Sequence, residues 1–229
     1  MDTEINYKRF INYFTKWEGA ALTGTALLAI GAFCLWIGWG YSYYLFLLSI
    51  PSMIVGVGFF LYGNIGRATE ADIRNIIPRK AEKLTFEELE EDIHLRRRTP
   101  KNYDVTVFEG FDLHPGVYVK KLKNASLCSS EYNYAKMVML NDAFYIKTVH
   151  FSFIADEEQY NVYDVAFDKV ENIVVERSQE NITSGKNSFR AKNCHLVIVY
   201  DGGQKLALRA NDDIYIDEMA ENLKRKLGI

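Results

Sequence analysis

A stretch of 50 residues without lysine or arginine lies between Lys16 and Arg67, and Glu18 is its only acidic residue. Residues 19–40 and 41–63 within it are two uncharged, mainly apolar segments. A membrane-spanning helix needs about 20 consecutive apolar residues, and a single helix over the whole stretch would far exceed the thickness of a bilayer. The stretch therefore predicts a transmembrane hairpin of two helices within residues 19–66, with a tight turn at residues 39–42.

Two other interpretations of this stretch are weaker. A signal peptide has an apolar core of about 7–15 residues, whereas here the first apolar run continues directly into a second. A buried helix pair of a soluble protein is the remaining alternative. The hairpin excludes a purely soluble protein and a polytopic transporter.

The basic residues around the stretch predict its orientation. Cytoplasmic flanks of transmembrane helices are rich in lysine and arginine, and here both flanks are basic while the turn is not. We expect an integral protein of a bacterial inner membrane with both termini in the cytoplasm. The residues expected at the membrane surface, in contact with lipid, are Lys8, Arg9, Lys16, Arg67, Arg74, Arg79 and Lys80.

Small residues recur every seven positions in both apolar segments, which places each set on one helix face. Such faces let helices approach closely in lipid. They either pack on each other inside the hairpin or drive self-association into an oligomer. Pro51 is expected to kink the second helix. Because neither segment holds Asp, Glu, Lys, Arg or His, a conducting pore is not indicated. The expected packing residues are Gly24, Gly31, Gly38, Ser49, Gly56 and Gly63.

Helical patterns also flank the hairpin. Residues 1–18 fit an amphipathic helix lying in the membrane interface, or a continuous extension of the first spanning helix. Residues 67–100 predict a charged helical linker, in which Pro78 ends one helix and Thr85 begins a second with a capping box. Arg96, Arg97 and Arg98 suit the end of that second helix, or contact anionic headgroups.

Residues 101–229 change to a β pattern rich in Val, Ile, Tyr and Phe. The runs predict seven or eight antiparallel strands, with a turn at Asp201-Gly202-Gly203 and an irregular insertion at residues 122–134. An amphipathic helix follows from Asp212 to Leu227. The predicted strands are 105–108, 117–121, 137–140, 143–151, 160–167, 172–177, 195–200 and 205–209.

Three stretches of this region resemble the pleckstrin-homology-like superfamily, in particular its bacterial PH and GRAM-like branch. They read MVMLNDAFYIK, VAFDKVENIVVE and HLVIVYDGGQKLALRANDDIYIDEMAENLKRKL. The resemblance implies an antiparallel PH-like barrel or sandwich with a C-terminal helix. It also implies a role in protein interaction or oligomerisation, because bacterial members are mostly interaction domains. Several bacterial families place such a domain after a two-helix membrane hairpin.

No known catalytic or phosphate-binding motif occurs in the chain. Cys34, Cys128 and Cys194 are far apart and suit free thiols in a reducing compartment. Cys194 and His195 are adjacent, but neighbours on a strand point to opposite faces. We therefore expect no enzyme activity, no metal site and no cofactor. The net charge of −3 and the pI of about 5.9 argue against a nucleic-acid partner.

Three functions are compatible with this organisation. The first is a non-enzymatic, membrane-anchored binding or scaffold protein whose β domain binds a protein partner or assembles with itself into a homo-oligomer. The second is a membrane-disrupting effector of anti-phage defence that a cyclic nucleotide gates. The third is an accessory subunit of a membrane transport complex. For the second, the candidate ligand-binding residues, chosen by type, are Arg177, Arg190, Arg209, Tyr132, Tyr134 and Tyr160.

Overall fold

The computed structural model describes residues 5–17, 19–84, 105–185, 187–210 and 214–229. The chain forms two compact units, residues 1–69 and residues 70–229. The second linker helix predicted from Thr85 and the arginines at 96–98 lie outside the described residues.

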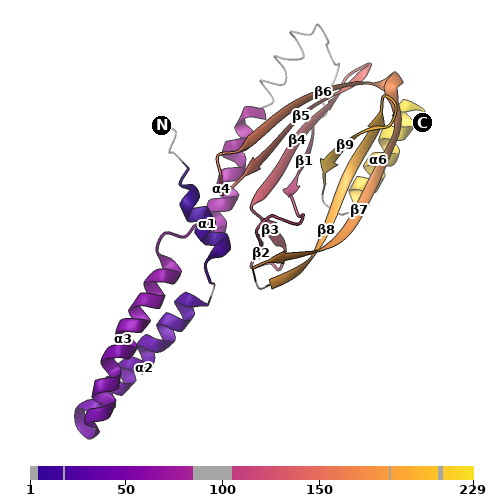
Figure 1. Cartoon of the computed structure of the whole chain (residues 1–229). Helices are drawn as coiled ribbons and strands as arrows, with labels where there is room; N and C mark the ends of the chain where they lie inside the picture. Colours follow the sequence, from indigo (N-terminus) through magenta and orange to yellow (C-terminus); the bar gives the residue numbers. More distant parts are fainter. Residues whose placement is uncertain (1–4, 18, 85–104, 186, 211–213) are drawn as a thin grey trace. The chain divides into compact units, whose positions relative to one another are not determined.

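The first unit contains two long apolar helices. Helix α2 (Ala20–Tyr41) and helix α3 (Tyr43–Asn64) are joined at Ser42, whose backbone is extended. Both helices are long and apolar enough to cross a membrane. They pack against each other as a hairpin (Figure 1). The predicted two-helix arrangement and its tight turn are therefore confirmed.

Small residues line the contact between α2 and α3. A Cβ added to Gly63 would lie 2.5 Å from the backbone nitrogen of Ala21, and one added to Gly24 would overlap the backbone nitrogen of Phe60. Gly31, Gly38 and Gly56 meet the opposite helix in the same way. Ser49, Gly56 and Gly63 are buried on α3. The small faces of both helices are thus occupied by each other within one hairpin.

Two serine hydroxyls lie near the middle of helix α3. Helix α3 continues through Pro51 to Asn64. The hydroxyl of Ser52 donates a hydrogen bond of 3.0 Å to the carbonyl of Leu27 on α2. Ser49 donates to the carbonyl of Phe46 within its own helix. Hydroxyls satisfied by helix carbonyls are tolerated in lipid.

The N-terminal helix is separate from α2. Helix α1 (Tyr7–Thr15) ends at Lys16, which has an extended backbone. The ammonium of Lys16 donates hydrogen bonds to the carbonyls of Tyr62 and Ile65, at 3.2 and 3.1 Å. It thereby satisfies carbonyls that the end of α3 leaves without intrahelical partners. Of the two arrangements left open for residues 1–18, the continuous extension is wrong.

The second unit begins with helix α4 (Glu70–Ala81) and the short 3₁₀-helix η1 (Glu82–Leu84). Pro78 was expected to end α4, but it lies inside the last turn. Ile73 and Ile76 of α4 are buried. The side chain of Lys80 is also buried, where it pairs with Glu158 and lies over the ring of Phe151.

Nine antiparallel strands form the β region among the described residues, one more than the largest number predicted. The larger sheet contains β1 (Val105–Phe111), β4 (Glu131–Met139), β5 (Ala143–Ser152) and β6 (Glu158–Ala166), in this spatial order. The strands β2 (Val119–Lys121) and β3 (Leu127–Ser129) pair separately. The second sheet contains β7 (Val170–Ser184), β8 (Asn187–Tyr200) and β9 (Gln204–Arg209). The additional strand arises because residues 122–134, predicted to be irregular, contain β3 and the start of β4.

The main core lies between the two sheets and helix α6 (Ile214–Leu227), which packs against β7 (Figure 1). Phe144 and Ile146 of the larger sheet meet Leu196 and Ile198 of β8 in this core. Gly228 follows α6 with a φ of +74° and ends the helix as predicted. The turn at 201–203 has positive φ at all three residues and joins β8 to β9.

Candidate functional site

A polar pocket opens between the larger sheet and strands β8 and β9. Its cavity volume is about 200 Å³. Alternate residues of a strand share one face, so the inner faces of several strands contribute polar groups to it. The polar residues that line it are Asp112, Asn133, Tyr134, Thr148, His150, Asn161, Tyr163, His195 and Arg209.

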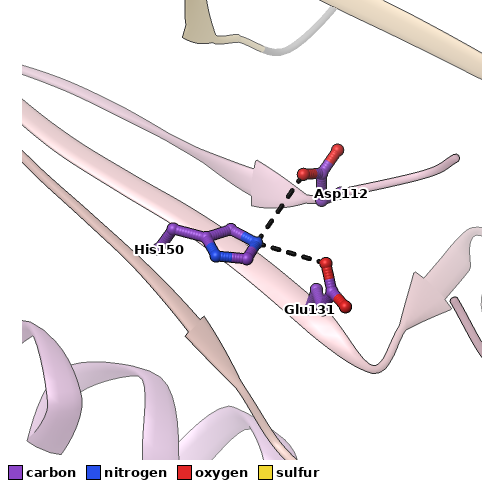
Figure 2. Close-up of side chains that lie close together, drawn as sticks. All are labelled: Asp112, Glu131 and His150. Carbon is purple, nitrogen blue, oxygen red and sulfur yellow. Dashed lines mark ion pairs between the residues drawn. The ribbon is translucent and has the colours of Figure 1, made fainter. Parts of the chain in front are cut away.

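A cluster of two carboxylates and one imidazole lies at the edge of this pocket (Figure 2). Nε2 of His150 lies 3.2 Å from Oε2 of Glu131 and 3.8 Å from Oδ2 of Asp112. One ligand atom from each of the three groups lies within 4.8 Å of the other two. We call these three residues the carboxylate–histidine cluster.

Strand register brings the cluster together. His150 of β5 is paired with Asn133 of β4, two residues from Glu131 and therefore on the same face. The backbone N–H of Asp112, which follows β1, donates to the carbonyl of Glu131 at 3.0 Å and extends the β1–β4 ladder by one residue. Strands β4 and β5 and the residue after β1 thus supply one side chain each.

His114, in the loop after β1, contacts the cluster from outside the pocket. Its Nε2 lies 3.2 Å from Oε2 of Glu131, the same oxygen that His150 contacts. Its Nδ1 lies 2.9 Å from the carbonyl of Pro115. Burial lowers the pKa of His114, but the hydrogen bonds to Pro115 and Glu131 and the charges of Asp112 and Glu131 together outweigh it, and the net pKa is above its usual value.

The opposite wall of the pocket carries a histidine and an arginine. Burial and the charge of Arg209 lower the pKa of His195, which favours its neutral form. The guanidinium of Arg209 donates to Oδ1 of Asn193 at 2.8 Å and to the carbonyl of Lys192 at 3.3 Å. Burial also lowers the pKa of Arg209 from its usual value. The hydrogen bonds to Asn193 and Lys192 of the neighbouring strand β8 hold the Arg209 side chain in place.

Of the six ligand-binding candidates, Arg209 and Tyr134 are among the residues that line the pocket. Tyr134 directly follows Asn133 on β4 and pairs with Glu109, so its side chain lies on the opposite face of the sheet from Asn133 and His150. Burial and Glu109 raise the pKa of Tyr134. Tyr132 is buried among Phe111, Phe151 and Phe153.

The other three candidates have partners elsewhere in the unit. Arg177 forms two hydrogen bonds with Asp217, Arg190 donates to Gln179, and the hydroxyl of Tyr160 donates to Glu158. None of these three residues lines the pocket.

The basic residues predicted at the membrane surface also have varied surroundings. Arg67 donates to the carbonyl of Tyr13, and Arg74 pairs with Glu70 one turn away. Lys80 is buried and pairs with Glu158. The prediction that Lys80 faces lipid headgroups is therefore wrong, because α4 directs this side chain toward β5 and β6.

The carboxylate–histidine cluster was missed by sequence reasoning, which predicted no metal site. Its members come from β4, β5 and the residue after β1, and the separations of 19 and 38 residues between them match no local ligand motif. The nearest signal is Asp112-Leu113-His114, two ligand-type residues on either side of one apolar residue. Only the strand register adds Glu131 and His150 to that pair.

Comparisons with protein-family models, curated proteins and solved structures gave no match to this chain.

Proposed function

We propose that this chain is a membrane-anchored binding protein, with α2 and α3 as the anchor and the β region as the part that binds a protein partner. The observation that carries the proposal is the direct contact of glycines with opposite backbone in the hairpin. Two helices that meet this closely form a closed pair, and their exposed residues are mainly apolar, as lipid requires. Such a hairpin anchors a protein without lining a channel.

A PH-like domain is the second part of the proposal. The resemblance implies antiparallel strands followed by a C-terminal helix, and sheets of four and three antiparallel strands followed by α6 support it. The β2–β3 hairpin is then an insertion between the first two strands of the larger sheet. This order supports a binding role and argues for no particular reaction.

Strand β6 supplies a surface for an extended segment of a protein partner. It lies at one end of the larger sheet, and its side chains from Gln159 to Val162 are exposed. Tyr160 and Val162 are 40% and 49% exposed. An exposed strand at a sheet edge offers backbone groups for a further strand.

A cyclic-nucleotide sensor is the second candidate, favoured by the position of Arg209 at the polar pocket. The size of the pocket argues against it. Sites for drug-sized ligands measure about 300–1,000 Å³, whereas this cavity measures about 200 Å³. A thermal-shift screen with cyclic di- and oligonucleotides distinguishes the candidates, since a shift that Arg209→Ala removes would favour the sensor.

Cysteine labelling tests the anchor and its orientation. In intact expressing cells, a membrane-impermeant maleimide should label Ser42→Cys in the hairpin turn. It should label Ser126→Cys in the β2–β3 turn only after lysis. The parent for both variants carries serine at the three native cysteines. Labelling of Ser126→Cys in intact cells would overturn the proposed orientation.

Site-specific photo-crosslinking tests the partner surface. A photoreactive residue at Val162 on the exposed strand should give a discrete adduct in cells, whereas one at exposed Glu176 on β7 should not. An adduct with the mass of two chains would identify a second copy as the partner instead. Absence of any adduct from Val162 would contradict a role for the β6 edge.

A further inference from the structure

The carboxylate–histidine cluster has the geometry of a metal site. A tetrahedral Zn²⁺ with bonds of about 2.0–2.2 Å separates its ligand atoms by about 3.3–3.6 Å. The distances from Nε2 of His150 to the oxygens of Glu131 and Asp112 are 3.2 and 3.8 Å and bracket this range. The ligand oxygens of Asp112 and Glu131 lie within 4.8 Å of each other, so the three ligand atoms can converge on one ion once these side chains adjust.

The chemistry of the donors selects the class of ion. Imidazole nitrogen suits Zn²⁺ and neighbouring transition metals, whereas Ca²⁺ and Mg²⁺ prefer oxygen ligands alone. The two carboxylates of Asp112 and Glu131 balance the charge of a divalent ion when His150 is neutral. We infer that Asp112, Glu131 and His150 bind a divalent transition-metal ion, and that Zn²⁺ is the ion that fits these donors best.

His114 acts as a positioning residue for the site. The carbonyl of Pro115 and the carboxylate of Glu131 can only accept, so Nδ1 and Nε2 of His114 both donate, over 2.9 and 3.2 Å. The ring is thereby oriented with Nε2 toward Oε2 of Glu131. Residues that orient metal ligands in this way typically account for about 10–100-fold in metal affinity.

The backbone of Glu131 is also held from both sides. Ser129 donates from its hydroxyl to the carbonyl of Glu131 at 2.8 Å, and the same carbonyl accepts from the N–H of Asp112. The site is consequently built on a fixed strand end and not on a free loop.

Three protein ligands leave one position of a tetrahedral ion open. Because Asp112 and His150 line the polar pocket, this position faces the pocket, where water or a small donor ligand completes the coordination. The cluster side chains are 27–34% exposed, which gives the ion a path from solvent. The inference does not depend on the membrane anchor or on a protein partner.

Zinc titration of the full chain tests the inference. The protein is purified in detergent without a histidine tag, stripped with EDTA and titrated with ZnCl₂ against a chromophoric chelator. We expect one Zn²⁺ per chain, with no displacement by excess Mg²⁺. Failure of the wild-type chain to bind Zn²⁺ would overturn the inference, as would equal binding of Ca²⁺.

Variants assign the ligands and the positioning residue separately. Glu131→Gln and His150→Gln should abolish stoichiometric binding, whereas His114→Gln should weaken it by about 10–100-fold. The matched control is Glu171→Gln, because exposed Glu171 lies outside the cluster and its amide replacement can still accept from the N–H of Gly202. Unchanged binding in both ligand variants would contradict the assignment.

Cobalt spectroscopy separates loss of the site from loss of the fold. Co²⁺ in a four-coordinate site gives intense visible bands, which six-coordinate Co²⁺ in water lacks. We expect these bands in the wild-type chain and their loss in Glu131→Gln, with the far-ultraviolet circular dichroism of the two proteins superimposable. Only weak six-coordinate bands in the wild type would overturn the four-coordinate arrangement.

Discussion

His150 and Glu131 face each other across strands β5 and β4, with Nε2 of the histidine 3.2 Å from Oε2 of the glutamate. Neither side chain is directly opposite the other in the ladder, where His150 pairs with Asn133 and Glu131 with Ser152. The contact is a diagonal one, of the kind that long side chains make on one face of a sheet. It therefore depends on the β4–β5 register.

Zinc should stabilise the folded chain through this pair. An ion that binds only the folded state adds about 2.7 kcal/mol at a concentration 100 times its Kd. We expect the thermal midpoint of the wild-type β region to rise with added Zn²⁺ and to fall again with EDTA. The Glu131→Gln variant should show no such response, and an equal response in this variant would place the ion elsewhere.

The pair of buried Lys80 and partly buried Glu158 should contribute to the attachment of α4 to the β region. Removing one partner of a fully buried ion pair typically costs about 3–5 kcal/mol, and an exposed pair contributes about 0–1 kcal/mol. Because Lys80→Met removes the ammonium from partly buried Glu158, we expect a loss between these limits. Lys80→Met should therefore lower the urea midpoint. The double variant Lys80→Met/Glu158→Gln should recover part of the loss.

The control variant for Lys80→Met is Lys205→Met. Lys205 pairs with Glu176 on the surface, where both side chains are at least half exposed, and such pairs contribute about 0–1 kcal/mol. Equal losses in Lys80→Met and Lys205→Met would show that the burial of Lys80 has no energetic consequence.

Glycine substitutions should separate the inner and outer faces of the hairpin. A Cβ at Gly24 would overlap backbone of α3, whereas one at Gly58 meets nothing within 4 Å. Overpacking of a close contact costs about 1–3 kcal/mol. We expect Gly24→Ala to lower the thermal midpoint of the detergent-solubilised chain and Gly58→Ala to leave it unchanged. The reverse order would mean that the helices pack through other faces.

Acid should destabilise the β region in part through His195. Burial and the charge of Arg209 lower the pKa of His195, while Asp112 and Glu176 oppose them. The unfolded chain then binds this proton more tightly than the folded chain, so stability falls as pH drops below about 6.5, the ordinary pKa of histidine.

The His195→Gln variant isolates that contribution. Unfolding midpoints measured from pH 7.5 to pH 5 should fall less steeply in the variant than in the wild type. Identical slopes would show that His195 takes up its proton equally in the folded and unfolded chains.

The hairpin was predictable because its signal is local and strong. Uncharged segments of spanning length and a basic flank on each side define α2 and α3, and Ser42 breaks them where the turn was expected. The Asp201-Gly202-Gly203 turn and the stripe of α6 were equally local signals. The sequence alone did not decide whether α1 is a separate helix or an extension of α2. The break at Lys16 is stabilised by hydrogen bonds to the carbonyls of Tyr62 and Ile65, which are distant in the sequence.

The strand ends and the site were harder to predict because they depend on long-range pairing. Strands β7 and β8 extend well beyond the predicted 172–177 and 195–200. The additional residues are mainly polar and show no apolar pattern, and the pairing of the two strands extends over them. Pro78 lies in the last turn of α4, where it disturbs only the end of the helix. The carboxylate–histidine cluster follows from the register of three strands, which no spacing in the sequence indicates.

Alkaline carbonate extraction of membranes from cells that express the full chain tests the central claim, the membrane anchor, most directly. Carbonate releases peripheral proteins but leaves proteins held by spanning helices in the pellet. We expect the chain to stay in the pellet and to be released only by detergent. Recovery of the chain in the carbonate supernatant, with a known integral protein retained in the pellet, would contradict it.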